Sequence, residues 1–372
     1  MSEIRGVARR TMPHVRVVYL ADAPYIHTRR WVQHFARLGW DAHVISFRQA
    51  AIEGATVHYI DGFERLGKAR YLLHARRVGS LIRELRPDLL HALHLTSYGF
   101  LAGLSGVQPS IVSVWGTDVL EAPSLTPAHR WITRHALARA GAITATGARL
   151  AEATLPHAPP GKTVRVIPYG VELEMFRPQP RQEHTPLVIG SVARLSPEKG
   201  LEYLLRAVAL LRDRADRNYE RHPAIEVVLA GDGPSRESLE YLTAELRLNE
   251  WVRFLGEVAH DDVPHVLQSF DIFAMPSTWE GFGVSALEAS AMELPVVASD
   301  VHGIPDVVVH GETGILTPPR DVEAIADAIA RLIGDAELRR RMGAAGRAFV
   351  ERHYRWQDNA ALMEQLYEEM VE

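Results

Sequence analysis

The 372-residue sequence contains no cysteine. This absence excludes disulfides, thiolate catalysis and cysteine-ligated zinc, and it fits a reducing compartment. No apolar run approaches the roughly 18 residues that a membrane-spanning helix needs. The first apolar run is a short strand interrupted by Arg16, which is not the pattern of a signal peptide. We therefore expect a cytoplasmic protein.

Metal-binding motifs are also missing. There is neither a clustered Asp-x-Asp nor a His-Glu-x-x-His motif, so we expect no metal site, although 18 histidines leave room for weak adventitious binding. A hydrophobic content of 47% and a charged content of 23% are typical of a globular protein. The length exceeds that of most single domains, which favours two.

Charge is distributed unevenly along the chain. The net charge is −5, but residues 1–170 carry 21 Lys and Arg against 11 Asp and Glu, and the remainder carries 20 against 35. A basic half suggests an anionic partner such as lipid headgroups at the inner face of the cell membrane. An arginine-rich solvated surface accounts for the excess equally well, because no polybasic run stands out. We expect no nucleic-acid partner.

The first half reads as alternating strands and helices. Val15–Leu20, Thr28–Leu38 and Ala42–Phe47 form a strand, helix, strand unit. Further strands are expected at Val57–Ile60, Leu89–Leu93, Ile111–Trp115, Ala142–Ala145 and Val164–Ile167, and helices at about Lys68–Leu85 and Thr126–Ala140. This spacing predicts a doubly wound parallel sheet.

Polar and aromatic residues follow these strands, where parallel sheets bind ligands. They are His27, His91, His94, Trp115 to Asp118, and Thr144 to Thr146. Lone histidines are more often structural than catalytic, but several at one sheet edge favour a functional site.

The second half repeats the pattern. After the strand Leu187–Val192, Arg194 and Lys199 flank a turn, and Gly200 leads into a helix. Two cations after a strand suit a diphosphate, and a solvated turn explains them equally well. The strand Ile225–Ala230 ends at Gly231 and Gly233, and Trp251–Leu255 precedes the loop Gly256 to Val258. From Asp321 onward we expect two or three amphipathic helices.

The stretch Asp271–Gly303 predicts a strand, a glycine loop and a helix that stops before Pro295. A helix that begins after Gly281 and Gly283 offers free N–H groups and a positive dipole end to phosphate. Glu288 shares the inward stripe of this helix, so it either pairs with an Arg or accepts hydrogen bonds from ligand hydroxyls.

Glu280 would lie roughly 12 Å up the axis if the helix extended that far. Two carboxylates that bracket a phosphate-favouring helix end suit a nucleoside diphosphate sugar.

These residues carry a resemblance. Glu280-x7-Glu288 within EGFGVSALEA, followed by LPVVASDVHGIPDVV and HGETGILTPP, resembles the donor-site signature of the retaining glycosyltransferases of family 4. The resemblance implies the GT-B fold, an α/β fold of two doubly wound Rossmann-like domains whose parallel sheets face a central cleft. Residues 1–170 would form the acceptor side and 171–353 the donor side. Residues 354–372 would pack back on the first domain, with a linker near Tyr169–Pro186.

The resemblance also implies roles for individual residues. Arg194 and Lys199 would contact the diphosphate, Glu280 the sugar hydroxyls and Glu288 the ribose. Gly231, Val258 and the run from Gly281 through Phe282 and Gly283 to Val284 would complete donor binding. We expect Glu280, Arg194, Lys199 and Asp118 to serve catalysis without a metal or other cofactor. The donor would be a UDP- or GDP-linked sugar, and the acceptor a lipid-linked sugar, a polysaccharide or a small glycoside of the cell envelope.

Two departures from the family pattern matter. Many members have a His-Gly-x-Asp motif where this chain reads Trp115-Gly116-Thr117-Asp118, so the catalytic role of that His cannot be carried over. Trp115 is either a platform for a sugar or a core residue. The usual Gly-Gly loop after the first strand is replaced by DAPYIHTRR, so His27, Arg29 or Arg30 is expected to meet the acceptor or the donor there. The acceptor-side candidates are His27, His94 and Trp115. A nucleotide-sugar 2-epimerase of GT-B architecture and a non-catalytic donor-binding subunit remain alternatives.

Overall fold

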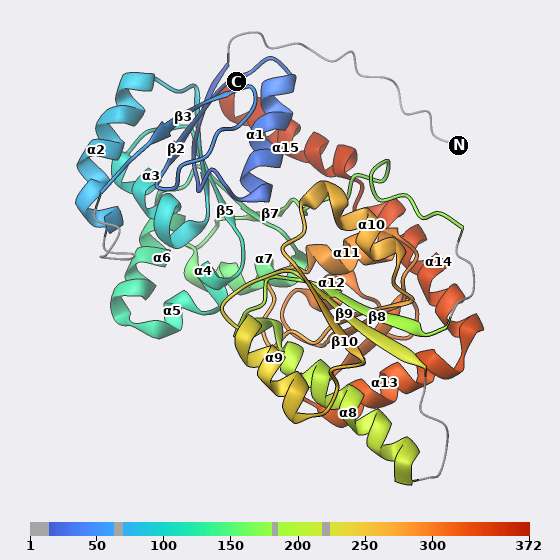
Figure 1. Ribbon diagram of the computed structural model, residues 1–372. Coiled ribbons are helices and arrows are strands. Elements are labelled where there is room, and N and C mark those ends of the chain that lie inside the picture. Colours follow the sequence, from blue (N-terminus) through green and yellow to red (C-terminus); the bar gives the residue numbers. More distant parts are fainter. Residues whose placement is uncertain (1–14, 63–69, 181–184, 218–223) are drawn as a thin grey trace, which may run out of the picture. The chain divides into compact units, whose positions relative to one another are not determined.

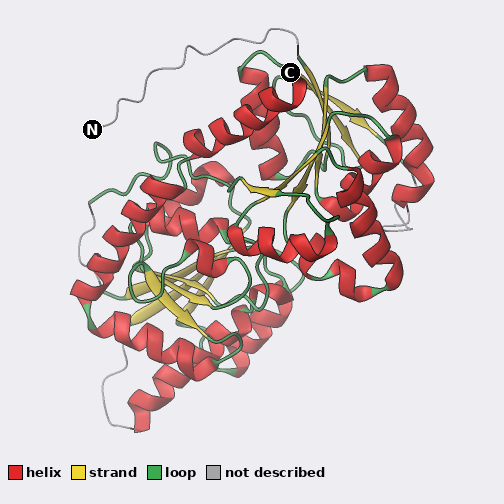
Figure 2. Ribbon diagram, turned by 180° about the vertical axis from the view of Figure 1, so that it is seen from behind, coloured by secondary structure: helices red, strands yellow, loops and turns green. Residues whose placement is uncertain are grey.

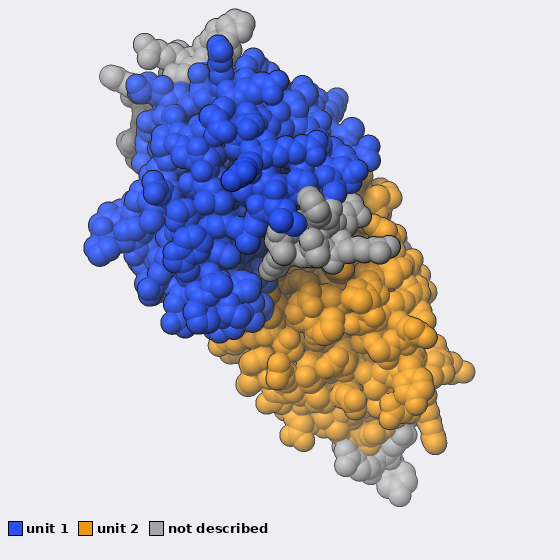
Figure 3. All heavy atoms as spheres, turned by 90° about the vertical axis from the view of Figure 1, so that its left-hand side faces the viewer, with its two compact units in different colours: residues 1–146, 150–167, 360–372 blue, residues 147–149, 168–359 orange. Residues whose placement is uncertain are grey.

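A computed structural model describes residues 15–62, 70–180, 185–217 and 224–372. These residues form two compact units (Figure 3). The described residues within 15–146, 150–167 and 360–372 form unit 1, and those within 147–149 and 168–359 form unit 2. The sequence placed the divisions after residues 170 and 353.

Unit 1 is built on a parallel sheet with the strand order β3-β2-β1-β4-β5-β6-β7 (Figure 1). The strands are β1 (Arg16–Leu20), β2 (Asp41–Ser46), β3 (Ala55–Tyr59), β4 (Leu89–Leu93), β5 (Ser110–Val114), β6 (Ala142–Ala145) and β7 (Val164–Val166). Every residue of β4 and β5 is buried, as expected for central strands covered on both faces.

Helices cover both faces of this sheet. The described helices of unit 1 are α1 (Ile26–Arg37), α2 (Arg70–Leu85), α3 (Phe100–Ser105), α4 (Thr117–Leu120), α5 (Ala122–Leu125), α6 (Pro127–Arg139) and α7 (Ala148–Thr154), with the π-helical turn η2 (Leu95–Gly99) and the 3-10 turn η3 (Leu155–His157). α2, α3 and α6 pack on the face that carries Val18, Leu90 and Val112. α1 packs against α15 (Trp356–Val371) through Phe35 and Tyr367, whose rings stack at 4.1 Å. The last residues of the chain thus belong to the core of unit 1.

A buried polar chain crosses the sheet beneath α15. His91, which is fully buried, contacts the Tyr367 hydroxyl through Nδ1 and Ser113 Oγ through Nε2 at 2.7 Å. Ser113 Oγ lies 2.7 Å from Thr144 Oγ1, and Tyr367 donates a hydrogen bond to Tyr19 at 3.3 Å. These bonds satisfy polar groups from four strands and fix the position of α15.

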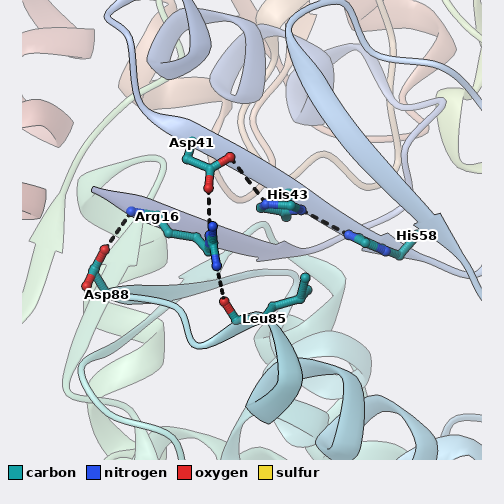
Figure 4. Close-up of polar contacts among 6 residues, drawn as sticks. All are labelled: Arg16, Asp41, His43, His58, Leu85 and Asp88. Carbon is teal, nitrogen blue, oxygen red and sulfur yellow. Dashed lines mark hydrogen bonds and ion pairs between the residues drawn. The ribbon is translucent and has the colours of Figure 1, made fainter. Parts of the chain in front are cut away.

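At the amino-terminal ends of the strands of this sheet, Arg16 links β1 to β2 and to the end of α2 (Figure 4). Its Nε lies 2.6 Å from Asp41 Oδ2, and a terminal guanidinium nitrogen donates to Leu85 O at 2.7 Å. The hydrogen bond from Arg16 holds the pKa of Asp41 below its usual value. His43 lies 3.3 Å from Asp41 and shares a 3.0 Å hydrogen bond with His58. Arg16, which interrupts the first apolar run of the sequence, therefore connects three secondary-structure elements.

Unit 2 contains a second parallel sheet, whose strands are yellow in Figure 2. The strand order is β10-β9-β8-β11-β12-β13. Its strands are β8 (Leu187–Val192), β9 (Ile225–Ala230), β10 (Val252–Gly256), β11 (Ile272–Met275), β12 (Val296–Ser299) and β13 (Gly314–Thr317). Its described helices are α8 (Leu201–Arg217), α9 (Arg236–Glu245), α10 (Val263–Gln268), α11 (Val284–Ala291), α12 (Ile304–Val307), α13 (Val322–Gly334) and α14 (Ala336–His353), with the 3-10 turns η4 (Pro197–Lys199) and η5 (His260–Asp262).

Local sequence explains where the helices of unit 2 begin and how they pack. Asp321 and Asp335 cap α13 and α14 by accepting hydrogen bonds from Ala324 N at 2.9 Å and Leu338 N at 2.8 Å. The apolar stripe of α8, with Leu201, Leu204 and Leu205, lies in the core beneath β8 and β9.

The predicted strands and long helices are confirmed, with ends shifted by at most a few residues. The predicted helix from Lys68 begins outside the described residues. The sequence did not predict η2, α3 to α5, α7, α9, α10 or α12. The proposed linker is held within unit 2, because Val171 N donates to Tyr354 O at 2.7 Å and Arg347 donates to Phe176 O at 2.6 Å. Residues 181–184 of that segment lie outside the described part.

His91 makes the stability of unit 1 depend on pH. Burial lowers the pKa of His91 from 6.5 to about 3. Between these values the unfolded chain takes up a proton that the folded protein excludes, so stability is full above pH 6.5 and falls on acidification. We expect this group to remove up to about 1.4 kcal/mol of unfolding free energy per pH unit. Urea unfolding between pH 7.5 and 4.5 should show a shallower dependence for His91→Gln. Parallel curves for the two proteins would refute this role of His91.

Candidate functional site

The order of strands in unit 2 places two loops at one crevice. The chain runs from β8 outward to β10, then returns to β11 on the other side of β8. The loops that follow β8 and β11 therefore diverge at the carboxyl edge, where open parallel sheets bind ligands. The first loop carries Arg194 and Lys199, and the second carries Glu280.

Lys199 and Glu280 form an ion pair across this crevice. Lys199 Nζ lies 2.6 Å from Glu280 Oε2, and the two side chains are only 23% and 14% exposed. The loops are also joined by their backbones, because Thr278 N donates to Glu198 O at 2.8 Å. An ammonium has three N–H donors, so this bond leaves Lys199 able to contact an anion as well.

Glycine makes this close approach feasible. Gly200 has φ of +61°, and a Cβ at this position would lie 2.2 Å from Pro276 O, at the start of the second loop. Gly231 has φ of +134°, and its Cβ would lie 1.9 Å from Ala193 O. Any side chain at either position would push the first loop away from its neighbours.

Arg194 is exposed on the first loop, and its charge reaches Glu198 in the same turn. Burial raises the pKa of Glu198, but the 2.5 Å hydrogen bond from Ser196 and the charges of Lys199 and Arg194 outweigh this, so the pKa is lowered. Glu198 therefore stays ionised beside the two cations, and it limits the positive charge of the loop.

The helix α11 begins at the same edge. Gly283 precedes it as the cap residue with φ of +99°, and glycine has no side chain to bond the first turn. The N–H groups and the positive dipole end are thus available to an anion. Because α11 starts at Val284, Glu280 lies in the preceding loop and not on an extension of the helix. The Phe282 side chain is 4% exposed and contacts the rings of Tyr169 and Tyr354, so it belongs to the core.

Glu288 faces inward from α11 and is 8% exposed. His260 lies near it, with Nδ1 4.0 Å from Glu288 Oε1. His260 comes from η5, two residues beyond Val258, and also contacts the Phe176 ring. Sequence reasoning missed His260, although its place just after β10 is a signal that could have found it.

Unit 1 has its own crevice, between β1 and β4, where the strand order reverses. The rings of His27 and Trp115 meet edge to face at 6.2 Å, so two of the acceptor-side candidates lie together. His94 has the strained backbone angles φ 92° and ψ 117°, and its Nδ1 lies 3.0 Å from Ser97 Oγ. These residues follow three different strands, His27 in the first turn of α1 after β1, His94 after β4 and Trp115 after β5.

Asp118 is 1% exposed and holds its own loop. It accepts hydrogen bonds from Leu95 N at 2.9 Å, from Gly116 N at 2.8 Å and from Trp115 N at 3.2 Å. This geometry favours a positioning role over direct contact with a substrate. The described residues include no group of three or more His, Asp or Glu side chains that could hold a metal ion.

Comparison with known proteins decides the family. Residues 174–349 match the family model described as glycosyl transferases group 1, and residues 16–147 match the glycosyl transferase 4-like model. A D-inositol 3-phosphate glycosyltransferase from Corynebacterium glutamicum is 30% identical over 99% of this chain and 85% of the relative. The chain belongs to the group 1 glycosyltransferases of the GT4 type. This confirms the resemblance seen in the sequence.

Another relative of this glycosyltransferase is the GDP-mannose-dependent α-(1-6)-phosphatidylinositol monomannoside mannosyltransferase of Mycobacterium tuberculosis. It is 35% identical over 219 residues, which are 54% of this chain and only 55% of the relative. The solved structure of Anabaena HepE in complex with UDP has a TM-score of 0.80 at 20% identity and covers 96% of this chain and 100% of its own. This likeness and the two parallel sheets confirm the predicted α/β GT-B fold. Among the described helices, we find none with the length and hydropathy needed to span a bilayer.

Gly200 tests how tightly the two loops of unit 2 must pack. Gly311 also has a positive φ, of +79°, but a Cβ there would meet nothing within 4 Å. We expect Gly311→Ala to lower the unfolding free energy by about 1 kcal/mol from backbone strain alone. Gly200→Ala adds the clash with Pro276 and should cost at least about 1 kcal/mol more in urea unfolding. Equal costs for the two variants would show that the loops do not need this contact.

Proposed function

We propose that this glycosyltransferase moves a sugar from a nucleoside diphosphate sugar to an acceptor hydroxyl with retention of the anomeric configuration. The observation that carries the proposal is the Lys199–Glu280 pair at the crevice between β8 and β11, beside the uncapped start of α11. A cation, a carboxylate and a helix N-terminus together match a diphosphate that bears a sugar.

In this proposal the diphosphate binds to Arg194, Lys199 and the N–H groups at Gly283 and Val284. Glu280 accepts hydrogen bonds from sugar hydroxyls, and Glu288 does so from the ribose. Gly231, Val258 and the backbones of Gly281 and Phe282 line the remaining donor site. Unit 2 is then the donor side and unit 1 the acceptor side, with His27, His94 and Trp115 as acceptor candidates and Asp118 holding the Trp115 loop.

The reaction breaks the bond between the anomeric carbon and the diphosphate oxygen. The acceptor oxygen attacks from the same face, and the leaving phosphate takes the acceptor proton. Arg194, Lys199 and the α11 N-terminus stabilise the negative charge that develops on the leaving group, which removes the need for a divalent metal. No protein nucleophile is required, and Glu280 orients the sugar without acting as a base.

The donor and acceptor classes follow from the relatives. GDP-mannose is named for the mycobacterial relative and UDP for the Anabaena structure, so we infer a GDP- or UDP-linked donor. The named acceptors of two relatives are a phosphatidylinositol mannoside and inositol 3-phosphate. We infer a lipid-linked or small polyol acceptor in cell-envelope glycolipid or polysaccharide synthesis.

Binding of the nucleotide tests the donor site. We expect one of UDP, GDP and ADP to bind the wild type with micromolar affinity in EDTA. Glu288→Ala should weaken this binding ~10–100-fold, or about 1.4–2.8 kcal/mol, because the ribose loses its acceptor. Glu312→Ala, which removes an exposed carboxylate of the same unit, serves as the calorimetric control. If none of the three nucleotides binds, the donor site is misassigned.

Product analysis tests the activity itself. Incubation with GDP-mannose or UDP-glucose and with inositol 3-phosphate or phosphatidylinositol should give a new glycoside, whose anomeric configuration in an NMR spectrum equals that of the donor. A donor epimerised at C2 would favour an epimerase, and binding without any product would favour a donor-binding subunit. An inverted glycoside would contradict retention.

We further propose that unit 1 contacts anionic lipid at the inner face of the cell membrane. The α2 helix exposes Leu72 and Leu73, which are 56% and 53% accessible, next to the exposed Arg76 and Arg77. Apolar side chains flanked by arginines suit an anionic bilayer surface better than water. The exposed residues of α2 are thus the surface through which the positively charged first half would contact the membrane.

Vesicle sedimentation tests the membrane contact. Binding to phosphatidylglycerol vesicles should exceed binding to phosphatidylcholine vesicles and should fall as salt rises. The double variant Leu72→Ser, Leu73→Ser should bind at least about fivefold more weakly because it loses apolar burial. Tyr241→Ser removes a 73% exposed ring from unit 2 and is the control. Equal binding to both vesicle types would contradict the proposal.

A further inference from the structure

His302 has a backbone conformation that its residue type disfavours. Its φ is +40°, in the left-handed region. Arg247 and Glu293 also have positive φ, but each lies within two residues of the end of a helix, α9 or α11, where this conformation is the usual cap. His302 lies between β12 and α12, so no helix cap explains it. Glycine or asparagine would adopt this angle at lower cost.

The surrounding chain holds His302 in this conformation. Gly303 packs so closely on the donor loop, as we call residues 276–283 between β11 and α11, that a Cβ would lie 2.2 Å from Gly281 O. The Gly303 N–H donates to Glu280 O at 3.3 Å, and Val301 N donates to Ser299 O at 2.9 Å. The strained residue is thereby fixed next to the backbone of Glu280.

The His302 side chain completes an aromatic surface beside that carboxylate. It is exposed, and its ring centroid lies 5.6 Å from that of Trp279 at an interplanar angle of 44°. Trp279 is half-buried and directly precedes Glu280. Its indole Nε1 is buried and has no hydrogen-bond partner among the described residues. Strain and an unpaired donor at one place both cost stability, and such costs gather where a ligand is bound.

We propose that Trp279 and His302 form an aromatic wall that contacts the sugar of the donor and contributes to its selection. A hexose presents C–H groups on its ring face and hydroxyls at its rim, so an aromatic surface beside a carboxylate fits both. The wall acts on the sugar and not on the nucleotide, because it adjoins Glu280 and lies outside the loop that bears Arg194 and Lys199. This inference rests on the proposed function.

Calorimetry with matched ligands tests the wall. GDP is compared with GDP-mannose and UDP with UDP-glucose, using whichever pair binds the wild type. His302→Gly should keep the affinity for the nucleoside diphosphate within about twofold and lose about tenfold for the nucleotide sugar. The variant should be at least as stable as the wild type, because glycine relieves the strain. His302→Asn, which also tolerates positive φ but lacks the ring, should show the same selective loss.

Arg247→Gly relieves the same kind of backbone conformation away from the donor loop, and it should change neither affinity. Unchanged nucleotide-sugar affinity in both His302 variants, or an equal loss for the bare nucleoside diphosphate, would overturn the inference while leaving the proposed function intact. Failure of every nucleoside diphosphate to bind the wild type would instead overturn the proposed function, and the aromatic wall with it.

Discussion

The ion pair between Lys199 and Glu280 is the contact on which the proposed donor site depends. It joins two loops that leave neighbouring strands in opposite directions. An ion pair of this partial exposure adds little to stability by itself. The loops are held chiefly by Gly200 packing on Pro276 and by the hydrogen bond from Thr278 to Glu198. The pair therefore serves to present a cation and a carboxylate at a fixed separation.

The carboxyl edges of the two parallel sheets share two features. In each sheet the strand order reverses beside the first strand, and polar loops gather at that point. Each unit also has a histidine with positive φ just after a strand at this edge, His94 in unit 1 and His302 in unit 2. The core of unit 1 contains the hydrogen-bonded chain from His91 to Tyr367, and the core of unit 2 contains the apolar contacts of α8 and α13. These cores offset the cost of the two strained residues.

Much of this architecture could be predicted from the sequence. β4, β8 and β9 have the predicted bounds because central parallel strands are continuous apolar runs between turn residues. Short helices such as α3 and α10 were missed, since about six residues contain too few turns to show a helical period.

Side-chain neighbours across the fold were harder to predict. The sequence placed Lys199 and Glu280 in loops that follow strands of one sheet, but it did not predict that their side chains form an ion pair. His260 and Glu288 are 28 residues apart in the chain, and no spacing in the sequence indicates that their side chains approach each other. Asp118 was predicted to be catalytic from its motif, but its burial and three backbone donors could be seen only in the folded loop.

A crystal structure of the protein with its nucleoside diphosphate would test the central claim most directly. The account predicts diphosphate oxygens within hydrogen-bond distance of Lys199 Nζ and the Val284 N–H, and ribose hydroxyls on the Glu288 carboxylate. A nucleotide bound elsewhere in unit 2, with the Lys199–Glu280 pair and the start of α11 untouched, would contradict it.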